Sequence, residues 1–261
     1  MHSALWAAKT GLDAQQTRMT TVSHNLANVN TTGFKKDRAV FEDLLYQNQK
    51  QVGSATSQDT VSPTGLNLGT GVRVVATEKS YTQGQLLNTE NSLDVAINGR
   101  GFLQVLMPDG SFAYTRDGSL KMSAEGELVT ANGYRIQPAI TIPQGAQHID
   151  IASDGTINVQ LAGQAAPTGI GTLQLTDFVN PAGLQPIGDN LIVESAASGP
   201  AQTGNPGING LGRIEQGFLE GSNVNVVEEL VAMIETQRAY EMNSKAISTT
   251  DEMLQYVSNN L

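Results

Sequence analysis

The chain contains no cysteine. Disulfide bonds, thiolate metal sites and cysteine nucleophiles are therefore all excluded. It has three histidines, His2, His24 and His148, and no two of them fall within helical or hairpin reach of each other. A histidine-based metal centre or catalytic triad consequently has little support. A chain that must cross compartments unfolded would profit from the absence of cysteine, which many cytosolic proteins share.

Positive charge and long apolar runs are also scarce. The chain has 15 basic and 25 acidic residues, a net charge of −10, and its longest basic run is Lys35-Lys36. We therefore expect no nucleic-acid partner. No stretch approaches the roughly 18 apolar residues that a membrane span requires. The first residues lack the basic region and apolar core of a signal peptide, so any export is expected to proceed without a cleaved signal.

Patterns that would indicate an enzyme are missing. The 27 glycines include no GxxxxGK phosphate loop, and the glycine-rich tracts 65–71 and 207–212 lack the strand and helix context of a dinucleotide site. The Asp-Gly pairs lack the alternating oxygen ligands of a calcium loop. Four central carboxylates could in principle pair as general acid and base: Asp94, Asp109, Asp117 and Glu125. Nothing in the sequence brings two of them to one cleft. We expect no catalytic residue, metal or cofactor.

The C-terminal residues, 217–261, carry a strong seven-residue repeat. Its main row consists of Val226, Met233, Tyr240, Ile247 and Leu254. A second row beside it consists of Ala232, Ala239, Ala246 and Met253. Such rows predict a coiled-coil-like helix seam. Asn225 is the expected N-cap, with Glu228 closing a capping box and Glu229 facing the positive end of the helix dipole.

A matching stripe lies near the N-terminus. It consists of Leu5, Leu12, Met19 and Leu26, with Val22 and Val29 on the adjoining position. We predict a helix over about 3–28, ended by a left-handed Gly33. The two stripes favour an antiparallel pairing of the terminal helices, which places both termini at one end and makes the rest a long insertion. The alternative is that each helix is an ordinary amphipathic helix packed on a globular core.

Between the helices the pattern changes twice. A short amphipathic segment, 38–47, is followed by a polar tract, 48–71, that is either a flexible linker or an extended arm ordered against neighbouring subunits. Strands are then predicted over 72–76 and 79–87. Turn signals follow at short intervals: Asp109-Gly110, Asp117-Gly118, Glu125-Gly126, Asn132-Gly133 and Asp154-Gly155. They predict a run of hairpins or a meander.

The sequence thus predicts an α+β fold in which paired terminal helices carry an inserted β-rich outer domain on extended connecting arms. The terminal helices form an inner domain, 1–33 and 222–261. The connecting region comprises 34–93 and 196–221, including the arm at about 48–71. The β-rich domain covers 94–195, and polar tracts bracket it as linkers bracket an inserted domain.

Three blocks carry a resemblance to a known family. They are NLANVNTTGFK at 25–35, SLDVAINGRGFLQV at 92–105 with YTRDGSL at 114–120, and GSNVNVVEELVAMIETQRAYEMNSKAI at 221–247. In this order, and over essentially the whole chain, they resemble the bacterial flagellar rod and hook family. Residues 41–62 resemble an insertion that distinguishes a rod member of that family from the hook protein.

The resemblance implies a structural subunit of the flagellar basal body. Its terminal helices would form an inner coiled-coil layer around an export channel, and its β domain would face outward. The expected partners are further copies of the chain, proximal rod proteins, the hook protein, the peptidoglycan-associated and outer-membrane ring proteins, and the flagellar type III export apparatus. The rod would cross the periplasm and transmit torque. The expected assembly interface is Leu5, Leu12, Met19, Leu26, Val226, Met233, Tyr240, Ile247 and Leu254.

Two alternatives stay open at this point. The chain could be a proximal rod or hook subunit of the same family, from which the insertion after Phe41 and the modest β domain would distinguish it. It could instead be a soluble periplasmic binding module or a glycan hydrolase acting on peptidoglycan. The hydrolase would need a cleft with paired carboxylates.

Overall fold

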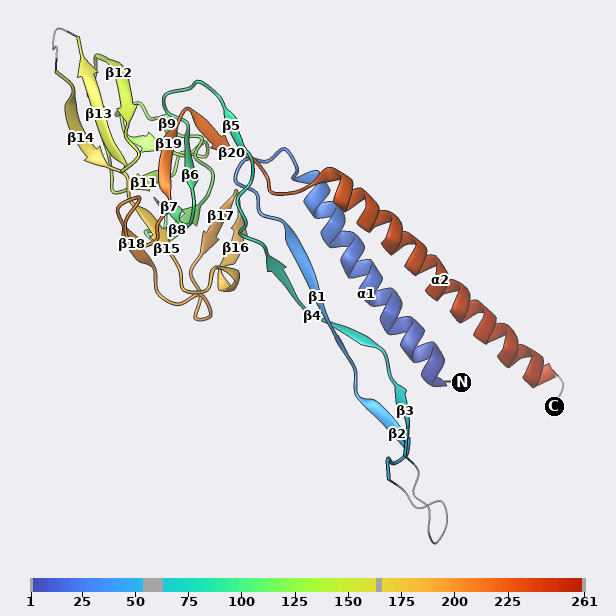
Figure 1. The fold of residues 1–261 in the computed structure, drawn as a ribbon. Helices are drawn as coiled ribbons and strands as arrows, with labels where there is room; N and C mark the ends of the chain where they lie inside the picture. Colours follow the sequence, from blue (N-terminus) through green and yellow to red (C-terminus); the bar gives the residue numbers. More distant parts are fainter. Residues whose placement is uncertain (1, 54–62, 163–165, 260–261) are drawn as a thin grey trace. The chain divides into compact units, whose positions relative to one another are not determined.

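The computed structural model describes residues 2–53, 63–162 and 166–259, and it shows a long helix near each end of the chain with strands between them (Figure 1). The predicted α+β class is confirmed. The chain divides into two compact units. Unit 1 comprises Met1–Leu26, Asp37–Glu78 and Asn225–Leu261, and unit 2 comprises Ala27–Lys36 and Lys79–Val224.

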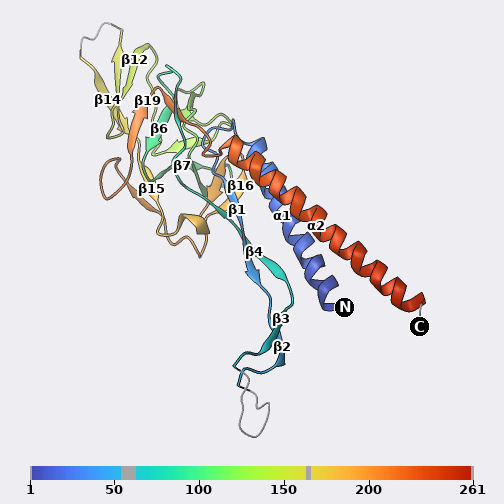
Figure 2. The ribbon, with the colours of Figure 1, turned by 45° about the vertical axis from the view of Figure 1, so that its right-hand side comes forward.

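The two helices of unit 1 are α1, His2–Ala27, and α2, Val226–Asn259. They lie side by side in both views, and the start of α1 and the end of α2 lie at the same end of the pair (Figures 1 and 2). The predicted N-cap residue of α2 is confirmed, because the side-chain oxygen of Asn225 accepts a hydrogen bond from Val227 N at 3.1 Å. The capping box with Glu228 stays a prediction. After α1 the chain turns at Gly33 with φ +69°, the left-handed conformation expected there.

Unit 1 also contains two antiparallel ribbons of two strands each. β1, Asp37–Asp43, pairs with β4, Val72–Lys79, and β2, Tyr46–Lys50, pairs with β3, Leu66–Gly69. The amphipathic segment predicted over 38–47 therefore forms parts of two strands. Its apolar residues do not share one covered side, because Leu45 is 88% exposed. The predicted arm lies partly in the β2–β3 ribbon, and its residues 54–62 are outside the described part of the chain.

The β1–β4 ribbon is tied to α1 by hydrogen bonds within unit 1. The Thr10 hydroxyl accepts from Val72 N at 3.3 Å, and the Asn25 side-chain oxygen accepts from Asp37 N at 2.8 Å. Next to the first contact, Gly71 has φ +120°, and a Cβ there would collide with the Thr10 hydroxyl oxygen. Only glycine allows the ribbon to approach the helix this closely.

Unit 2 holds most of the strands, in four antiparallel groups. The largest runs in the order β16-β17-β8-β7-β11-β10-β9, with β15 paired to both β7 and β18. The other groups are β12-β13-β14, β19-β6 and β20-β5. The bounds are β5 Leu86–Asn88, β6 Val95–Asn98, β7 Phe102–Leu106, β8 Phe112–Thr115, β9 Lys121–Met122, β10 Leu128–Val129, β11 Arg135–Gln137, β12 Ala146–Ile151, β13 Thr156–Leu161, β14 Thr168–Thr172, β15 Leu175–Asp177, β16 Gln185–Gly188, β17 Leu191–Val193, β18 Gln202–Gly204, β19 Arg213–Gln216 and β20 Phe218–Glu220, with a short 3₁₀ helix at Pro181–Gly183.

Four of the five predicted turns connect neighbouring strands of unit 2. They are centred on Gly110, Gly126, Gly133 and Gly155, each with φ between +84° and +86°. The Asp117-Gly118 prediction is wrong as a hairpin turn. Ser119 instead forms an isolated bridge to Asp94, and a Cβ on Gly118 would collide with the Val95 carbonyl oxygen. The prediction of one strand over 79–87 is also wrong, because residue 79 ends β4, residues 86 and 87 belong to β5, and residues 80–85 have no strand pairing.

The apolar core of the structure lies in unit 2. Its largest cluster includes Leu103, Leu120, Ile157, Leu173 and Leu175, each with an exposed fraction of 0%. A smaller aromatic cluster packs Tyr114 edge-on against Phe178, with ring centroids 4.8 Å apart. The inserted β region therefore buries a core of its own.

Candidate assembly surface

The predicted seam residues are only partly covered within one chain. In α1, Leu5, Leu12, Met19 and Leu26 are all half-buried. In α2, Met233, Ile247 and Leu254 are half-buried, whereas Val226 is 40% and Tyr240 43% exposed. Each of these nine side chains therefore has apolar surface left to bury. Whether they form a coiled-coil seam in an assembly stays a prediction.

The most buried row of α2 is a different one. It recurs every seven residues and lies three positions after the predicted row: Glu229, Thr236, Asn243 and Thr250. Glu229 is 2% and Thr236 0% exposed. The predicted second row fits less well, since Ala246 and Met253 are exposed. A sequence search for apolar repeats misses this row because its members are polar.

The hydroxyl groups of the two threonines in this row donate hydrogen bonds to the backbone of their own helix. Thr236 donates to Ala232 O at 2.6 Å, and Thr250 donates to Ala246 O at 2.7 Å, one turn earlier in the same helix. A hydroxyl bonded in this way can be buried without the penalty of a lost hydrogen bond. Thr236 and Thr250 thus present small, methyl-bearing side chains that allow close helix packing.

Contacts between the helices run in antiparallel register. Near the start of α2, Asn25 Nδ2 donates to the Glu229 carboxylate at 3.2 Å. Seven residues earlier in α1, Arg18 pairs with Glu235 at 3.5 Å. A further seven residues earlier, a Cβ at Gly11 would lie 3.0 Å from the Asn243 side-chain nitrogen. The Arg18–Glu235 pair is exposed and contributes little. Asn25–Glu229 is the buried contact of the three.

Asn25 is a junction between three segments of unit 1. It is 1% exposed, and its amide exchanges two hydrogen bonds with the backbone of Asp37, accepting from N at 2.8 Å and donating to O at 2.9 Å. Its second donor proton reaches Glu229. The end of α1, the beginning of β1 and the first turn of α2 are therefore joined by one side chain. Glu229, expected to face the positive end of the helix dipole, is also part of this junction.

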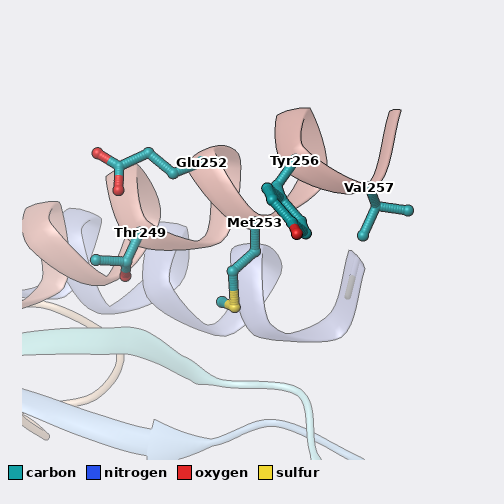
Figure 3. Close-up of a pocket in the computed structure, with 5 residues that line it drawn as sticks. All are labelled: Thr249, Glu252, Met253, Tyr256 and Val257. Atoms are coloured by element: carbon teal, nitrogen blue, oxygen red, sulfur yellow. The ribbon is translucent and has the colours of Figure 1, made fainter. Parts of the chain in front are cut away.

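Much of the rest of α2 exposes apolar side chains. Val227, Val231 and Ile234 are each at least 50% exposed in its first half. Near its end, an open and mostly apolar hollow is lined by Thr249, Glu252, Met253, Tyr256 and Val257 (Figure 3). The hollow offers apolar contact but no convergent set of polar groups of the kind that orient a small-molecule ligand.

Across the described ranges, 2–53, 63–162 and 166–259, no group of three or more His, Asp or Glu side chains is placed to hold a metal ion. The same residues include no helix that is both long and apolar enough to cross a membrane.

Three sequence-family descriptions match successive parts of the chain. Residues 5–35 match "Flagella basal body rod protein", which covers most of α1 and the following turn. Residues 96–159 match "Flagellar hook protein FlgE/F/G D1 domain", within the strands of unit 2. Residues 215–261 match "Flagellar basal body rod FlgEFG protein C-terminal", which includes β20 and α2.

Curated relatives match over the full length. The chain is 56% identical to the flagellar basal-body rod protein FlgG of Buchnera aphidicola subsp. Schizaphis graminum over 258 residues, 99% of each chain. It is 47% identical to the protein of the same name from Borreliella burgdorferi over 263 residues, 100% of this chain and 99% of the relative. The chain belongs to the flagellar rod and hook family. The resemblance drawn from the motif blocks at 25–35, 92–105, 114–120 and 221–247 is confirmed.

The helices with uncovered apolar faces lie in regions that match the rod and hook family. The family matches at 5–35 and 215–261 cover most of α1 and all of α2. Asn25 falls within the first of these regions and Glu229 within the second. The two residues that build the buried junction therefore lie in segments that the family shares, although sequence reasoning singled out neither as buried.

Proposed function

We propose that this chain is a structural subunit of the flagellar basal body that polymerises into the rigid helical distal rod. In this role it transmits torque from the motor to the hook and encloses the export channel. The observation that carries the proposal is the end-to-end similarity, at 47–56% identity, to rod proteins named FlgG. The role is mechanical and not enzymatic.

The uncovered helix faces supply the physical basis for polymerisation. The nine residues of the predicted interface keep apolar surface exposed within one chain, and burying one such side chain contributes about 1.5–3 kcal/mol. Val227, Val231 and Ile234 add further exposed apolar surface on α2. Contacts with other copies would cover both sets and form an inner coiled-coil layer. The free energy of folding of unit 1 would then be coupled to assembly.

The domain roles follow from this arrangement. Residues 1–33 and 222–261 form the inner helical domain, 94–195 form the outer β domain, and 34–93 with 196–221 connect them. The arm at about 48–71 packs between neighbouring subunits and stiffens the shaft. Its described strands support this role, because an isolated two-stranded ribbon is marginally stable in water and β2 is exposed along its whole length. If rods without residues 48–71 bend as little as intact rods, the arm is only a linker.

The partners and location belong to the same proposal. The subunit follows the flagellar type III export route and adds to the growing structure beyond the proximal rod proteins. The rod spans the periplasm within the peptidoglycan-associated and outer-membrane rings, which act as a bushing, and the hook protein continues the shaft. The family match to the rod proteins supports the basal-body location.

The test is to isolate detergent-resistant envelope complexes and to identify their proteins by mass spectrometry. The expected result is that this chain is present in many copies together with ring and hook proteins. Imaging of the same particles then locates it along the shaft. A chain that is soluble and monomeric in cells carrying complete flagella would overturn the proposal.

A further inference from the structure

The backbone passes between unit 1 and unit 2 four times, after residues 26, 36, 78 and 224. On the unit 2 side, three of these passages adjoin short segments that bond to one another. Ser80 N donates to Lys36 O at 2.8 Å. The Asn223 side chain accepts from Lys36 N at 2.7 Å and donates to Ser80 O at 2.8 Å. The segments near residues 36, 80 and 223 are therefore joined directly.

The buried carboxylate of Glu220 joins the same segments through a further set of hydrogen bonds. Glu220, 2% exposed, accepts hydrogen bonds from Lys35 Nζ at 2.6 Å, Gly84 N at 3.0 Å and an Arg116 guanidinium nitrogen at 3.0 Å. Its backbone oxygen accepts from Gly33 N at 2.8 Å. One residue of β20 thus bonds to the segment after α1, to the segment after β4 and to the residue that follows β8.

The charges of this cluster are unequal. Lys35 and Arg116 are 4% and 7% exposed, so two buried cations share one buried anion. Arg116 also donates to the backbone oxygens of Ile97 and Gly99, which help to hold its charge. Burial lowers the pKa of Lys35, while the carboxylate of Glu220 acts in the opposite direction. Removal of the carboxylate would leave two cations buried together, which is far more costly than removal of one cation.

We propose that Glu220 is a positioning residue. Within unit 2 it holds together three of the segments at which the backbone passes between the two units, so that these segments act as one connection. Backbone segments that are bonded to one another share an applied force, whereas unconnected segments can unfold one at a time. The mechanical meaning of this device rests on the proposed function as a rotating shaft. The positioning itself is a property of the single chain.

The first test is hydrogen exchange on the purified full chain with Glu220→Gln. We expect the amides of Gly33, Ser80 and Gly84 to exchange about 100-fold faster, because an uncompensated buried charge favours local opening. Amides of the β7–β8 hairpin should keep their protection. Equal acceleration throughout unit 2 would overturn the proposal, because Glu220 would then be merely part of the general core. Unchanged exchange at the three amides would also overturn it.

A second substitution separates charge balance from loss of packing. Lys35→Met in the Glu220→Gln chain removes one of the two unpaired cations, so exchange at Ser80 and Gly84 should slow again, although the hydrogen bonds of Lys35 Nζ to residue 220 and to Thr82 O are lost. If the double variant opens more than Glu220→Gln alone, the charge argument is wrong. Should Glu220→Gln fail to fold, Lys35→Met in the unaltered chain provides the test, because it removes a bond to Glu220 and leaves Glu220 paired with Arg116 alone. Exchange at Gly33 should then rise, and unchanged exchange there would overturn the proposal.

The mechanical role is tested in motile cells whose only version of this chain carries Asn223→Ala. Their rods should assemble, and swimming speed should fall more steeply with rising viscosity than in cells with the unaltered chain. A viscosity dependence equal to that of the unaltered chain would overturn the mechanical role. If the unaltered chain proves unnecessary for rotation, the proposed function fails, and hydrogen exchange still decides whether Glu220 positions the passages.

Discussion

The two units bury their apolar side chains very differently. In unit 2, Leu103 and Leu173 are entirely buried in a core built from several strand groups. In unit 1, the buried apolar residues of the described ranges are Ala14 and Val22, while Ile234 of α2 is 52% exposed. One chain thus completes the core of the β unit and leaves that of the helical unit incomplete. The contrast indicates that unit 2 folds alone and that unit 1 needs further contacts.

What unit 1 buries is largely polar. The helix pair places Asn25, Glu229 and Thr236 at its most covered positions. Polar groups in such positions add little stability, but they penalise any register in which their partners are lost. We infer that these contacts fix how α1 and α2 align and that apolar burial in the assembly supplies most of the stabilisation. Four substitutions test this contrast.

The largest effect is expected from Ile247→Asp in α2. Ile247 is half-buried within one chain, so a carboxylate there costs little until other copies cover it. Incorporation into rods should be lost, while the thermal transition of unit 2 is unchanged. Ser244→Asp, which adds the same charge at an exposed position of the same helix, is the control. Functional rods built from the Ile247→Asp chain would contradict the proposed interface.

Leu103→Ala should show the opposite behaviour. Leu103 is 0% exposed, and truncating such a side chain in a core costs about 2–5 kcal/mol. Chemical denaturation of the purified chain, followed by the near-ultraviolet circular dichroism of the aromatic cluster around Tyr114, should show unit 2 unfolding at lower denaturant. Ile247→Ala is the matched truncation in unit 1 and should leave that transition in place. Equal losses from both substitutions would remove the contrast between the units.

Features set by local chemistry were predictable from the sequence. Asp-Gly, Glu-Gly and Asn-Gly pairs specify turns because glycine adopts positive φ freely, and Gly110 and Gly155 do so as expected. The same reasoning failed at Asp117-Gly118. There the Asp117 carboxylate accepts from Ser119 N and from the Thr32 hydroxyl, a partner 85 residues away in the chain. A dipeptide cannot reveal such a contact.

The buried carboxylates were not predictable for a related reason. Glu229 stands in a first helical turn, where an exposed acidic residue is common, and Glu220 stands in a short strand. Their burial depends on donors that are 204 residues away for Glu229, in Asn25, and 185 residues away for Glu220, in Lys35. The apolar stripes identified both helices correctly, but a search for apolar repeats passes over a row whose members are Glu, Thr and Asn.

Asn25→Ala tests the polar junction with an intermediate effect. The substitution removes a donor to Glu229 and both bonds to the Asp37 backbone, so we expect unit 1 to lose about 1–3 kcal/mol. Helical circular dichroism during thermal unfolding measures the change, and Ser23→Ala at an exposed position of α1 is the control. An unchanged helical transition would mean that the junction does not determine the alignment of the helices.

The smallest effect is expected at a turn of unit 2, through pH. The Asp109 carboxylate accepts from the Ser111 hydroxyl at 2.6 Å and from Ser111 N at 2.9 Å, and these bonds lower its pKa below the ordinary value of 3.8. A carboxyl group whose pKa is lower in the folded state stabilises the fold fully above its unfolded pKa. This contribution is lost as the pH falls through the folded pKa. Asp109→Asn should therefore lower the melting temperature of unit 2 slightly at pH 6 and leave no difference near pH 2. Because Asp109 belongs to unit 2, the helical transition of unit 1 should be the same in both chains at each pH, and a parallel shift would show that the two units do not unfold separately.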